Sequence, residues 1–217
     1  MQGKRLLLSM ISGLSLGLAM TTSSFAIISL PCGWYAEGNV GYPSISDASF
    51  PDDLDRSTGR NIAGNLNIGY KFMPYFALEV GGSRYPNTNL QFTEITTSAS
   101  GCCDVTTTTN VAKIEHWSVD VAAKGIIPII DSGFELFAKV GVARSLAKLT
   151  IQDQDLANDF GLSNNSNYAT GVYLGVGGQW YFVWPELAAN IQWQRADGNN
   201  STGTYNLYSV GLSFIFY

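Results

Sequence analysis

Charged side chains are scarce in this sequence, and its one long apolar run lies within the first 26 of 217 residues. Asp, Glu, Lys and Arg make up 13% of the residues, whereas 46% are hydrophobic. There are 12 basic residues against 17 acidic ones, and one histidine. Nucleic-acid binding needs a basic patch, so this composition argues against a nucleic-acid partner. No segment after residue 26 is apolar over the about 20 residues that a membrane helix requires.

The first 26 residues have the pattern of a secretory signal peptide. Lys4 and Arg5 precede an apolar run over residues 6–19, and Ser24 and Ala26 place small side chains at −3 and −1 of a cleavage point. The run is too short for a membrane anchor and is interrupted by Ser and Gly. We expect cleavage after Ala26, which removes two of the 12 basic residues and leaves 10 against 17 acidic ones, a formal charge of −7.

Eight later segments alternate between large apolar residues and polar or small ones. This period of two is typical of β-strands with one apolar face. A membrane protein without membrane helices must be a closed barrel, because only helices and closed sheets satisfy every backbone group in lipid. We therefore predict an all-β fold over residues 33–217, a closed eight-stranded antiparallel up-and-down transmembrane β-barrel. The segments are 33–42, 60–72, 76–83, 113–127, 134–143, 168–182, 187–194 and 205–217.

The connections between these segments alternate between short and long. Short turns are expected around Pro74, residues 128–133 and Pro185. The long connections, rich in Asn, Ser, Thr and Asp, span about residues 43–59, 86–112, 146–167 and 196–204. Bacterial outer-membrane barrels have short periplasmic turns and long outward loops. This topology places both termini in the periplasm, whereas a soluble sandwich or lipocalin-like barrel, the remaining alternative, has no reason to alternate in this way.

From residue 33 to 216 the chain resembles the small OmpA/OmpX-like outer-membrane barrels. The resemblance rests on GWYAEGNVGY, GYKFMPYFALEVGG and GLSFIF. In such barrels the assembly machinery reads a terminal aromatic residue and the apolar residues two and four positions before it. Phe216, Phe214 and Leu212 match that pattern, although Tyr217 follows as one extra residue. The resemblance implies the bacterial outer membrane as location, and as partners its lipids, its lipopolysaccharide and the barrel assembly machinery.

Seven charged residues fall on the predicted inner faces of the strands. They are Glu37, Lys71, Glu79, Asp120, Lys124, Glu135 and Lys139. The interior of an eight-stranded barrel is only wide enough for side chains, so buried charges must pair. We expect Lys71 to face Glu79 across one hairpin, and Lys124 to face Glu135 across the next. Such a network plugs the lumen; the alternative is an ion path gated by switching pairs, which would make the protein a narrow passive pore.

Aromatic residues near the strand ends predict girdles at the two membrane interfaces. They are Trp34, Tyr70, Phe72, Trp180, Phe182, Trp193 and Phe216.

His116 and Ser118 share one face of a predicted strand, close enough for a base-activated nucleophile. Their spacing is similar to the His-x-Ser of outer-membrane lipid A deacylases. Those enzymes work on the lipid-facing surface, which here carries Trp117, and no acid stands where it would orient the imidazole. A lipid A-modifying esterase is therefore the second alternative function, and we expect no catalytic residues.

No metal or cofactor site is expected either. Asp153, Asp155 and Asp159 begin like an EF-hand calcium loop, but Asn158 and Asn164 replace the required Gly and Glu. Cys102 and Cys103 are neighbours that could bond only in a strained ring, and Cys32 is expected across the membrane from them, so we predict no barrel-crossing disulfide.

The leading functional hypothesis is a structural and interaction protein of the outer membrane. The barrel would display four surface loops, with a role such as adhesion or that of a surface antigen, because binding residues usually sit on loops held by a rigid scaffold. A host or cell-surface ligand is the partner expected for the loops.

Overall fold

The computed structural model describes residues 32–46, 55–58, 62–97, 104–129, 132–181, 186–199 and 202–216. The predicted signal peptide, Cys102, Cys103, Phe182, Pro185 and Tyr217 lie outside the described residues. Within the described part, no helix is long and apolar enough to cross a membrane. The elements are β1 (Gly33–Ser46), β2 (Asp55–Thr58), β3 (Ala63–Met73), β4 (Phe76–Arg84), β5 (Thr88–Thr97), β6 (Asp104–Ile129), β7 (Phe134–Ile151), α2 (Gln154–Asp159), β8 (Asn165–Tyr181), β9 (Leu187–Ala196) and β10 (Thr204–Phe216).

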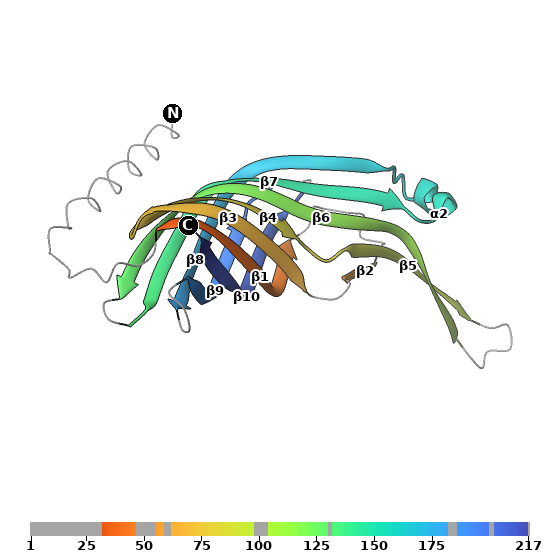
Figure 1. Cartoon of the computed structure of the whole chain (residues 1–217). Coiled ribbons are helices and arrows are strands. Elements are labelled where there is room, and N and C mark those ends of the chain that lie inside the picture. Colours follow the sequence, from red (N-terminus) through yellow and green to blue (C-terminus); the bar gives the residue numbers. More distant parts are fainter. Residues whose placement is uncertain are drawn as a thin grey trace, which may run out of the picture.

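Eight of the described strands close into a ring in which all neighbours are antiparallel (Figure 1). β1, β3, β4, β6, β7, β8, β9 and β10 each pair with the next strand of this series. The first and last strands complete the circle, in a register that runs from Trp34 opposite Phe216 to Ser46 opposite Thr204. The predicted eight-stranded up-and-down barrel is confirmed.

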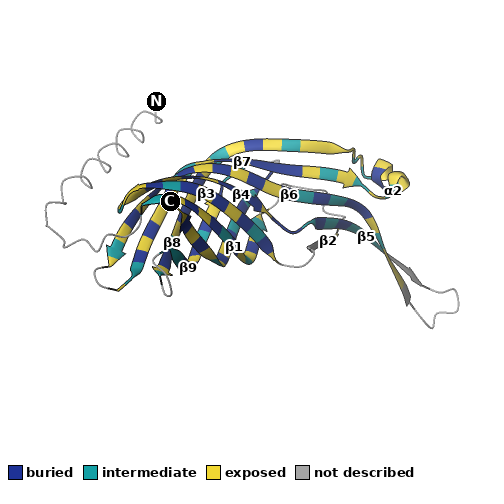
Figure 2. Cartoon of the chain, viewed as in Figure 1, coloured by how far each residue is buried: buried dark blue, intermediate teal, exposed yellow. Residues whose placement is uncertain are grey.

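Buried and exposed residues alternate along the ring strands, with apolar side chains on the outside (Figure 2). In β3, Leu66 is 72% exposed, whereas Asn65 and Asn67 are each 1% exposed. In β10, Ser213 is buried and Leu212 is exposed. A water-soluble protein buries its large apolar side chains preferentially, so this outer face is built to meet lipid.

Glycine at inward-facing positions such as Gly141 and Gly41 permits the close approach of ring strands. A Cβ atom at Gly141 of β7 would lie 2.0 Å from the carbonyl oxygen of Val121 in β6. One at Gly41 of β1 would lie 2.0 Å from the carbonyl oxygen of Tyr208 in β10. No side chain fits at these distances, so a larger residue at either position would force the neighbouring strands apart.

The two ends of the ring differ in their connections. At one end, named the turn end, Pro74 and Tyr75 join β3 to β4 in the predicted tight turn. Pro128, which was predicted to begin the next turn, instead lies within β6 and pairs with Glu135. The other end, named the loop end, carries the connections after β1, β4, β7 and β9.

Three of the predicted long loops contain regular structure instead. The prediction for residues 43–59 was wrong because the end of β1 and all of β2 lie there. The prediction for residues 86–112 was wrong because β5 and the first part of β6 lie there, paired with each other. The prediction for residues 146–167 was wrong because it covers the end of β7, α2 and the start of β8. β2 pairs with β5, so a sheet continues beyond the ring at the loop end (Figure 1). We name β2, β5, residues 104–115 of β6, residues 146–151 of β7 and α2 the loop-end sheet.

Candidate functional site

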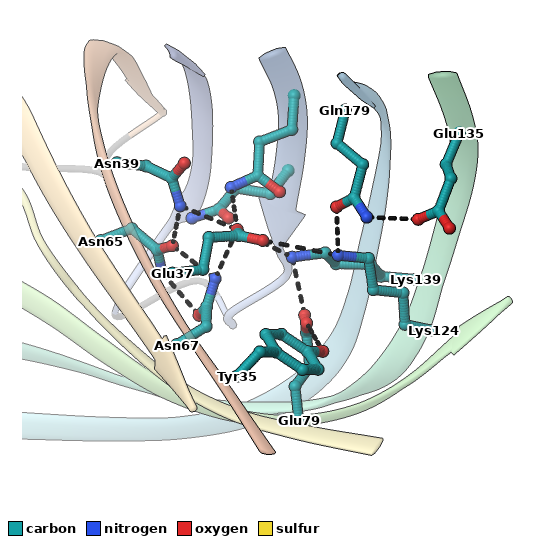
Figure 3. A network of polar contacts seen from close by, with 12 residues as sticks. Tyr35, Glu37, Asn39, Asn65, Asn67, Glu79, Lys124, Glu135, Lys139 and Gln179 are labelled. Carbon is teal, nitrogen blue, oxygen red and sulfur yellow. Dashed lines mark hydrogen bonds and ion pairs between the residues drawn. The ribbon is translucent and has the colours of Figure 1, made fainter. Parts of the chain in front are cut away.

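Ion pairs converge on Glu37 inside the ring (Figure 3). Lys124 Nζ and Lys139 Nζ each lie 3.4 Å from an oxygen of the Glu37 carboxylate. Lys139 also pairs with Glu79 at 2.7 Å. No more than 2% of any of these four side chains is exposed. An isolated charge in such a setting would be costly, so mutual pairing is what allows the lumen to hold them.

The prediction of two ion pairs across hairpins is wrong. Lys71 pairs with Glu135 at 2.7 Å rather than with Glu79, and the ion-pair partner of Lys124 is Glu37 rather than Glu135. The strand register offsets Lys71 from Glu79 by one inward-facing pair. In so narrow a ring, a long side chain can reach across the lumen as easily as along a hairpin. Lys71 and Lys124 both find their partners across the lumen.

Side-chain amides complete the hydrogen bonding of the Glu37 carboxylate. Its Oε1 accepts from Asn39 Nδ2 at 2.9 Å, Asn67 Nδ2 at 3.0 Å and Gln192 Nε2 at 3.0 Å. The hydroxyl of Tyr35 donates to Glu79 at 2.8 Å, and Gln179 donates to Glu135. The alternation along the strands predicts these amides on the inner faces but does not identify them as members of the site. Their convergence depends on β1, β3 and β9, which only the closed ring brings together.

The remaining lumenal acid, Asp120 of β6, has no ion-pair partner among the described residues. It is 2% exposed, and neither carboxylate oxygen has a hydrogen-bond partner in the described part of the chain. It lies over Gly81 of β4, where a Cβ atom would be 2.8 and 2.9 Å from the two oxygens. The seven lumenal charges therefore comprise four acids and three lysines, and the unpaired acid stands on the loop-end side of Lys124.

Three tyrosines fill the lumen near the loop end. The rings of Tyr85 and Tyr205 stack with their centroids 4.8 Å apart. The hydroxyl of Tyr173 donates to Gln194 at 3.0 Å. All three tyrosines are buried and pack with Leu207 in one apolar cluster. These stacked aromatic side chains, together with the ion-paired side chains nearer the turn end, fill the interior of the barrel.

His116 lies beside this cluster, inside the ring. Its ring nitrogens are 3.3 Å from Thr88 Oγ1 and from the Tyr205 hydroxyl. His116 and Ser118 are each 2% exposed, while Trp117 between them is 44% exposed. A lipid that approached the outer wall would meet Trp117, so the geometry does not present His116 and Ser118 to a lipid substrate.

Asp153 is the N-cap of helix α2. Its carboxylate accepts hydrogen bonds from the backbone nitrogens of Asp155 at 3.1 Å and Leu156 at 3.2 Å. Capping satisfies donors that a helix start leaves free, and this accounts for the acidic spacing that resembles a calcium loop. In the described residues, no three His, Cys, Asp or Glu side chains are grouped to hold a metal ion.

The loop-end sheet has an apolar core that is separate from the lumen. Leu90 of β5, Val111 and Ala112 of β6 and Ala157 of α2 are fully buried and pack in one cluster. The backbone nitrogens of residues 152 and 153 donate to the carbonyl oxygen of Val111, which fixes the start of α2 against β6. Partly buried apolar residues surround this core, namely Phe92, Leu149, Ile151, Leu156, Phe160 and Leu162. The region is therefore a folded layer rather than a set of loose connections.

The outer face carries aromatic side chains near both ends of the ring. At the turn end, Trp34, Tyr70 and Phe72 contact edge to face, with centroid distances of 5.3 and 4.8 Å. Near the loop end, Trp117 and Tyr168 are exposed on the outer wall. Such rings suit the interface between lipid and water.

The closing strand presents its large side chains outward. Leu212, Phe214 and Phe216 are all exposed on the outer wall of β10, opposite Gly38, Ala36 and Trp34 of β1.

A closed ring with an apolar outer wall and a polar, filled interior defines a small outer-membrane β-barrel protein. The chain belongs to the outer membrane protein beta-barrel domain family, whose sequence profile matches residues 12–216. The bacterial outer membrane is its location.

Solved structures with the same fold include three small outer-membrane proteins. The outer membrane protein OprG of Pseudomonas aeruginosa is 12% identical, with a TM-score of 0.54 over 85% of this chain and 96% of that chain. The N-terminal β-barrel domain of Pseudomonas aeruginosa OprF is 14% identical, with a TM-score of 0.51 over 85% and 98%. Neisserial surface protein A is 12% identical, with a TM-score of 0.50 over 85% and 97%. These likenesses show the fold alone. No curated protein sequence matches the chain.

Proposed function

We propose that this protein is an interaction protein of the cell surface, adhesion-like or antigen-like, in which the barrel anchors the loop-end sheet. In this proposal the loop end faces outward and both termini lie in the periplasm. The observation that carries it is the apolar core around Leu90 and Val111, because a chain that needed only to connect strands would not build a second core there. A rigid scaffold that presents such a layer is a common basis for binding.

The exposed residues in the loop-end part of β6 support a contact role. Thr106, Thr107, Thr108 and Asn110 of β6 are exposed on the loop-end sheet. Hydroxyl and amide groups both donate and accept hydrogen bonds, so they suit a polar partner. The partner proposed here is a molecule on a host or neighbouring cell.

The filled lumen favours this role over a narrow passive pore. Lys139, Lys124 and Glu37 lie across the interior, and Tyr85 and Tyr205 stack above them. In this proposal the lumenal charge network of Glu37, Lys71, Glu79, Asp120, Lys124, Glu135 and Lys139 plugs the barrel. Outer-membrane lipids and lipopolysaccharide cover the outer wall, and the assembly machinery reads Leu212, Phe214 and Phe216. No catalytic residue, cofactor or metal belongs to the proposal.

Attachment of whole cells tests the contact role. Bacteria that lack the protein are complemented with the wild-type chain, with Leu90→Asp or with Asp120→Asn, and their binding to cultured epithelial monolayers is counted. Leu90→Asp places a charge in the loop-end core, so it should remove most of the attachment that the wild type restores. Asp120→Asn lies in the lumen and should restore attachment fully. Heat-modifiable gel migration and surface labelling verify that each variant is folded and displayed.

Equal attachment with and without the protein would overturn the contact role for such cells. Full attachment by Leu90→Asp would show that the loop-end sheet is not the contact surface.

A further inference from the structure

The basic side chains of the outer wall gather toward the loop end. Those with described side chains outside the lumen are Arg84, Lys113, Arg144, Lys148 and Arg195. Each lies in the loop-end half of its strand. Near the turn end of the described strands, the outer wall instead carries the aromatic group of Trp34, Tyr70 and Phe72.

Three of these cations surround one carboxylate on neighbouring strands. Lys113 donates to Glu115 at 3.1 Å, and Lys148 stands directly opposite Glu115 in the register. Arg84 stands opposite Trp117, two residues further along β6. Glu115 lies on the loop-end side of Trp117. The four charged side chains therefore lie together on the adjoining strands β4, β6 and β7 and form one charged unit of the surface. Three basic side chains and one carboxylate give this unit a net positive charge.

An open groove of about 690 Å³ lies beside two of these cations, Arg84 and Lys113. Val40 and Ile62, which are 60% and 66% exposed, line its apolar side, and Arg84 and Lys113 line the other. Val40, Gly64, Arg84 and Trp117 follow one another in register across β1, β3, β4 and β6. Because Gly64 has no side chain, this row of positions has a gap on β3. The groove therefore joins the lipid-facing wall to the cationic group.

We propose that this groove binds a phosphate-bearing lipid of the outer leaflet. Its acyl chains would lie along Val40 and the apolar wall, and its phosphate would meet Arg84 and Lys113, which line the groove. Lys148 does not line the groove but would add positive charge from the neighbouring strand β7. Arg84 has no ion-pair partner among the described residues, and its planar guanidinium can bind a phosphate through two parallel hydrogen bonds. A soluble anion would leave the apolar side of the groove in contact with water, whereas a lipid covers both sides. The assignment rests on the proposed orientation of the loop end but not on the contact role of the loop-end sheet.

Lipid binding by the full-length folded protein in nonionic micelles tests the proposal. Native mass spectrometry is used to titrate bisphosphorylated lipid A, the same lipid without phosphates, and inorganic phosphate. The variants are R84Q/K113Q/K148Q and, as a matched control, R195Q. Arg195 lies on β9, across the ring from β4, and pairs with Asp197 at 2.6 Å. All variants keep long polar side chains on the outer wall, and heat-modifiable migration verifies folding.

The wild type should retain the phosphorylated lipid, and the triple variant should bind it at least about tenfold more weakly, since each cation near such a surface adds to the attraction. R195Q should bind as the wild type does. Unchanged binding by the triple variant, or equal retention of the phosphate-free lipid, would overturn the proposal. Inorganic phosphate bound in place of the lipid would assign the site to a soluble anion instead. Cell attachment plays no part in this readout, so the contact role and the lipid site can fail separately.

Discussion

Glu37 is the residue on which the lumenal contacts converge. Its carboxylate contacts two lysines and three amides, and these reach it from β3, β6, β7 and β9 as well as from β1 itself. A buried charge with so many partners is stabilised by all of them together, and its removal leaves charged groups behind. Asp120, on the loop-end side of this group, is the opposite case, because its carboxylate has no donor among the described residues.

These two acids should therefore respond differently to the loss of charge. Glu37→Gln leaves Lys124 without its ion-pair partner and should lower the free energy of unfolding by about 3–5 kcal/mol. Asp120→Asn removes an unpaired buried carboxylate and should be neutral or stabilising. Urea unfolding in lipid vesicles, followed by tryptophan fluorescence, measures both. A larger loss for Asp120→Asn than for Glu37→Gln would mean that an ordered partner for Asp120 matters more than the Glu37 contacts.

The closing strand allows a second comparison between matched residues. Phe216 is exposed to lipid, where a charge costs about 2–4 kcal/mol at the midplane and less near the interface. Ser213 faces the lumen directly opposite Glu37. Phe216→Lys should therefore block assembly far more than Ser213→Lys, as read from heat-modifiable migration of the membrane fraction.

Two outcomes would contradict the proposed sorting role of this strand. Normal assembly of Phe216→Lys would show that the machinery does not need this aromatic residue. If Tyr217→Lys alone abolished assembly, the terminal signal would be one residue further along the chain.

At the scale of the strand, alternation was sufficient to predict the ring but not the loop-end sheet. Each ring strand faces lipid on one side and a packed polar lumen on the other, so alternate residues carry opposite chemistry, as Leu66 and Asn67 do. The start of β6 instead contains a run of threonines over residues 106–109, which has no such alternation. Its pairing with β5 depends on tertiary contacts to α2 and β7 that the local pattern does not contain.

The lumenal site was predictable in its charged members but not in its pairing. Strand parity is a local property, and it placed Lys71 and Glu79 on inner faces. The partner of each charge depends on which strands lie across the ring, as with Lys71 of β3 and Glu135 of β7. That relation is set by closure and side-chain length, neither of which can be read from one hairpin.

The loop-end sheet should unfold as a unit without loss of the ring. Leu90→Asp buries a charge among apolar groups and should abolish hydrogen-exchange protection of the β5 amides and of residues 106–112. The amides of β9 and β10, which have no part in this core, should keep their protection. Amide exchange with mass spectrometry measures both regions in one sample. Loss of protection throughout would show that ring and sheet fold as one cooperative unit.

Protease added to intact cells tests the orientation of these elements. Cleavage is expected within residues 86–112, at the segment that joins β5 to β6, and within residues 146–167, after α2. The turn at Pro74 and Tyr75 should be spared, because it would face the periplasm. Cleavage at that turn from outside the cell would invert the proposed topology.

The barrel and the loop-end sheet bury opposite kinds of side chain, and both patterns occur within one strand, β6. In the ring, polar side chains are inside and apolar ones outside, whereas the loop-end sheet buries its apolar side chains. β6 follows both rules, with Val111 and Ile114 in the loop-end core and Asp120 and Lys124 in the lumen. The change of rule along β6 marks where the lipid-facing wall gives way to a water-exposed layer.

A ring filled in this way should conduct ions poorly. Protein reconstituted in planar bilayers is expected to show no stable channel, because the interior of an eight-stranded barrel holds side chains rather than a water column. Single-channel recording at moderate salt measures this. Reproducible openings on the order of several hundred picosiemens, as expected of a water-filled porin, would favour the passive pore instead.

The pairing of β1 with β10 also sets the order in which the protein can be made. The strand that begins at Gly33 pairs along nearly its whole length with the strand that ends at Phe216, which is synthesised after all the other described strands. Contacts so distant along the chain form slowly, because a long loop must close before they contribute. An incomplete ring would also leave two open edges in lipid. The chain must therefore cross the periplasm before β1 has paired with β10, and its insertion can finish only when the last strand reaches the first.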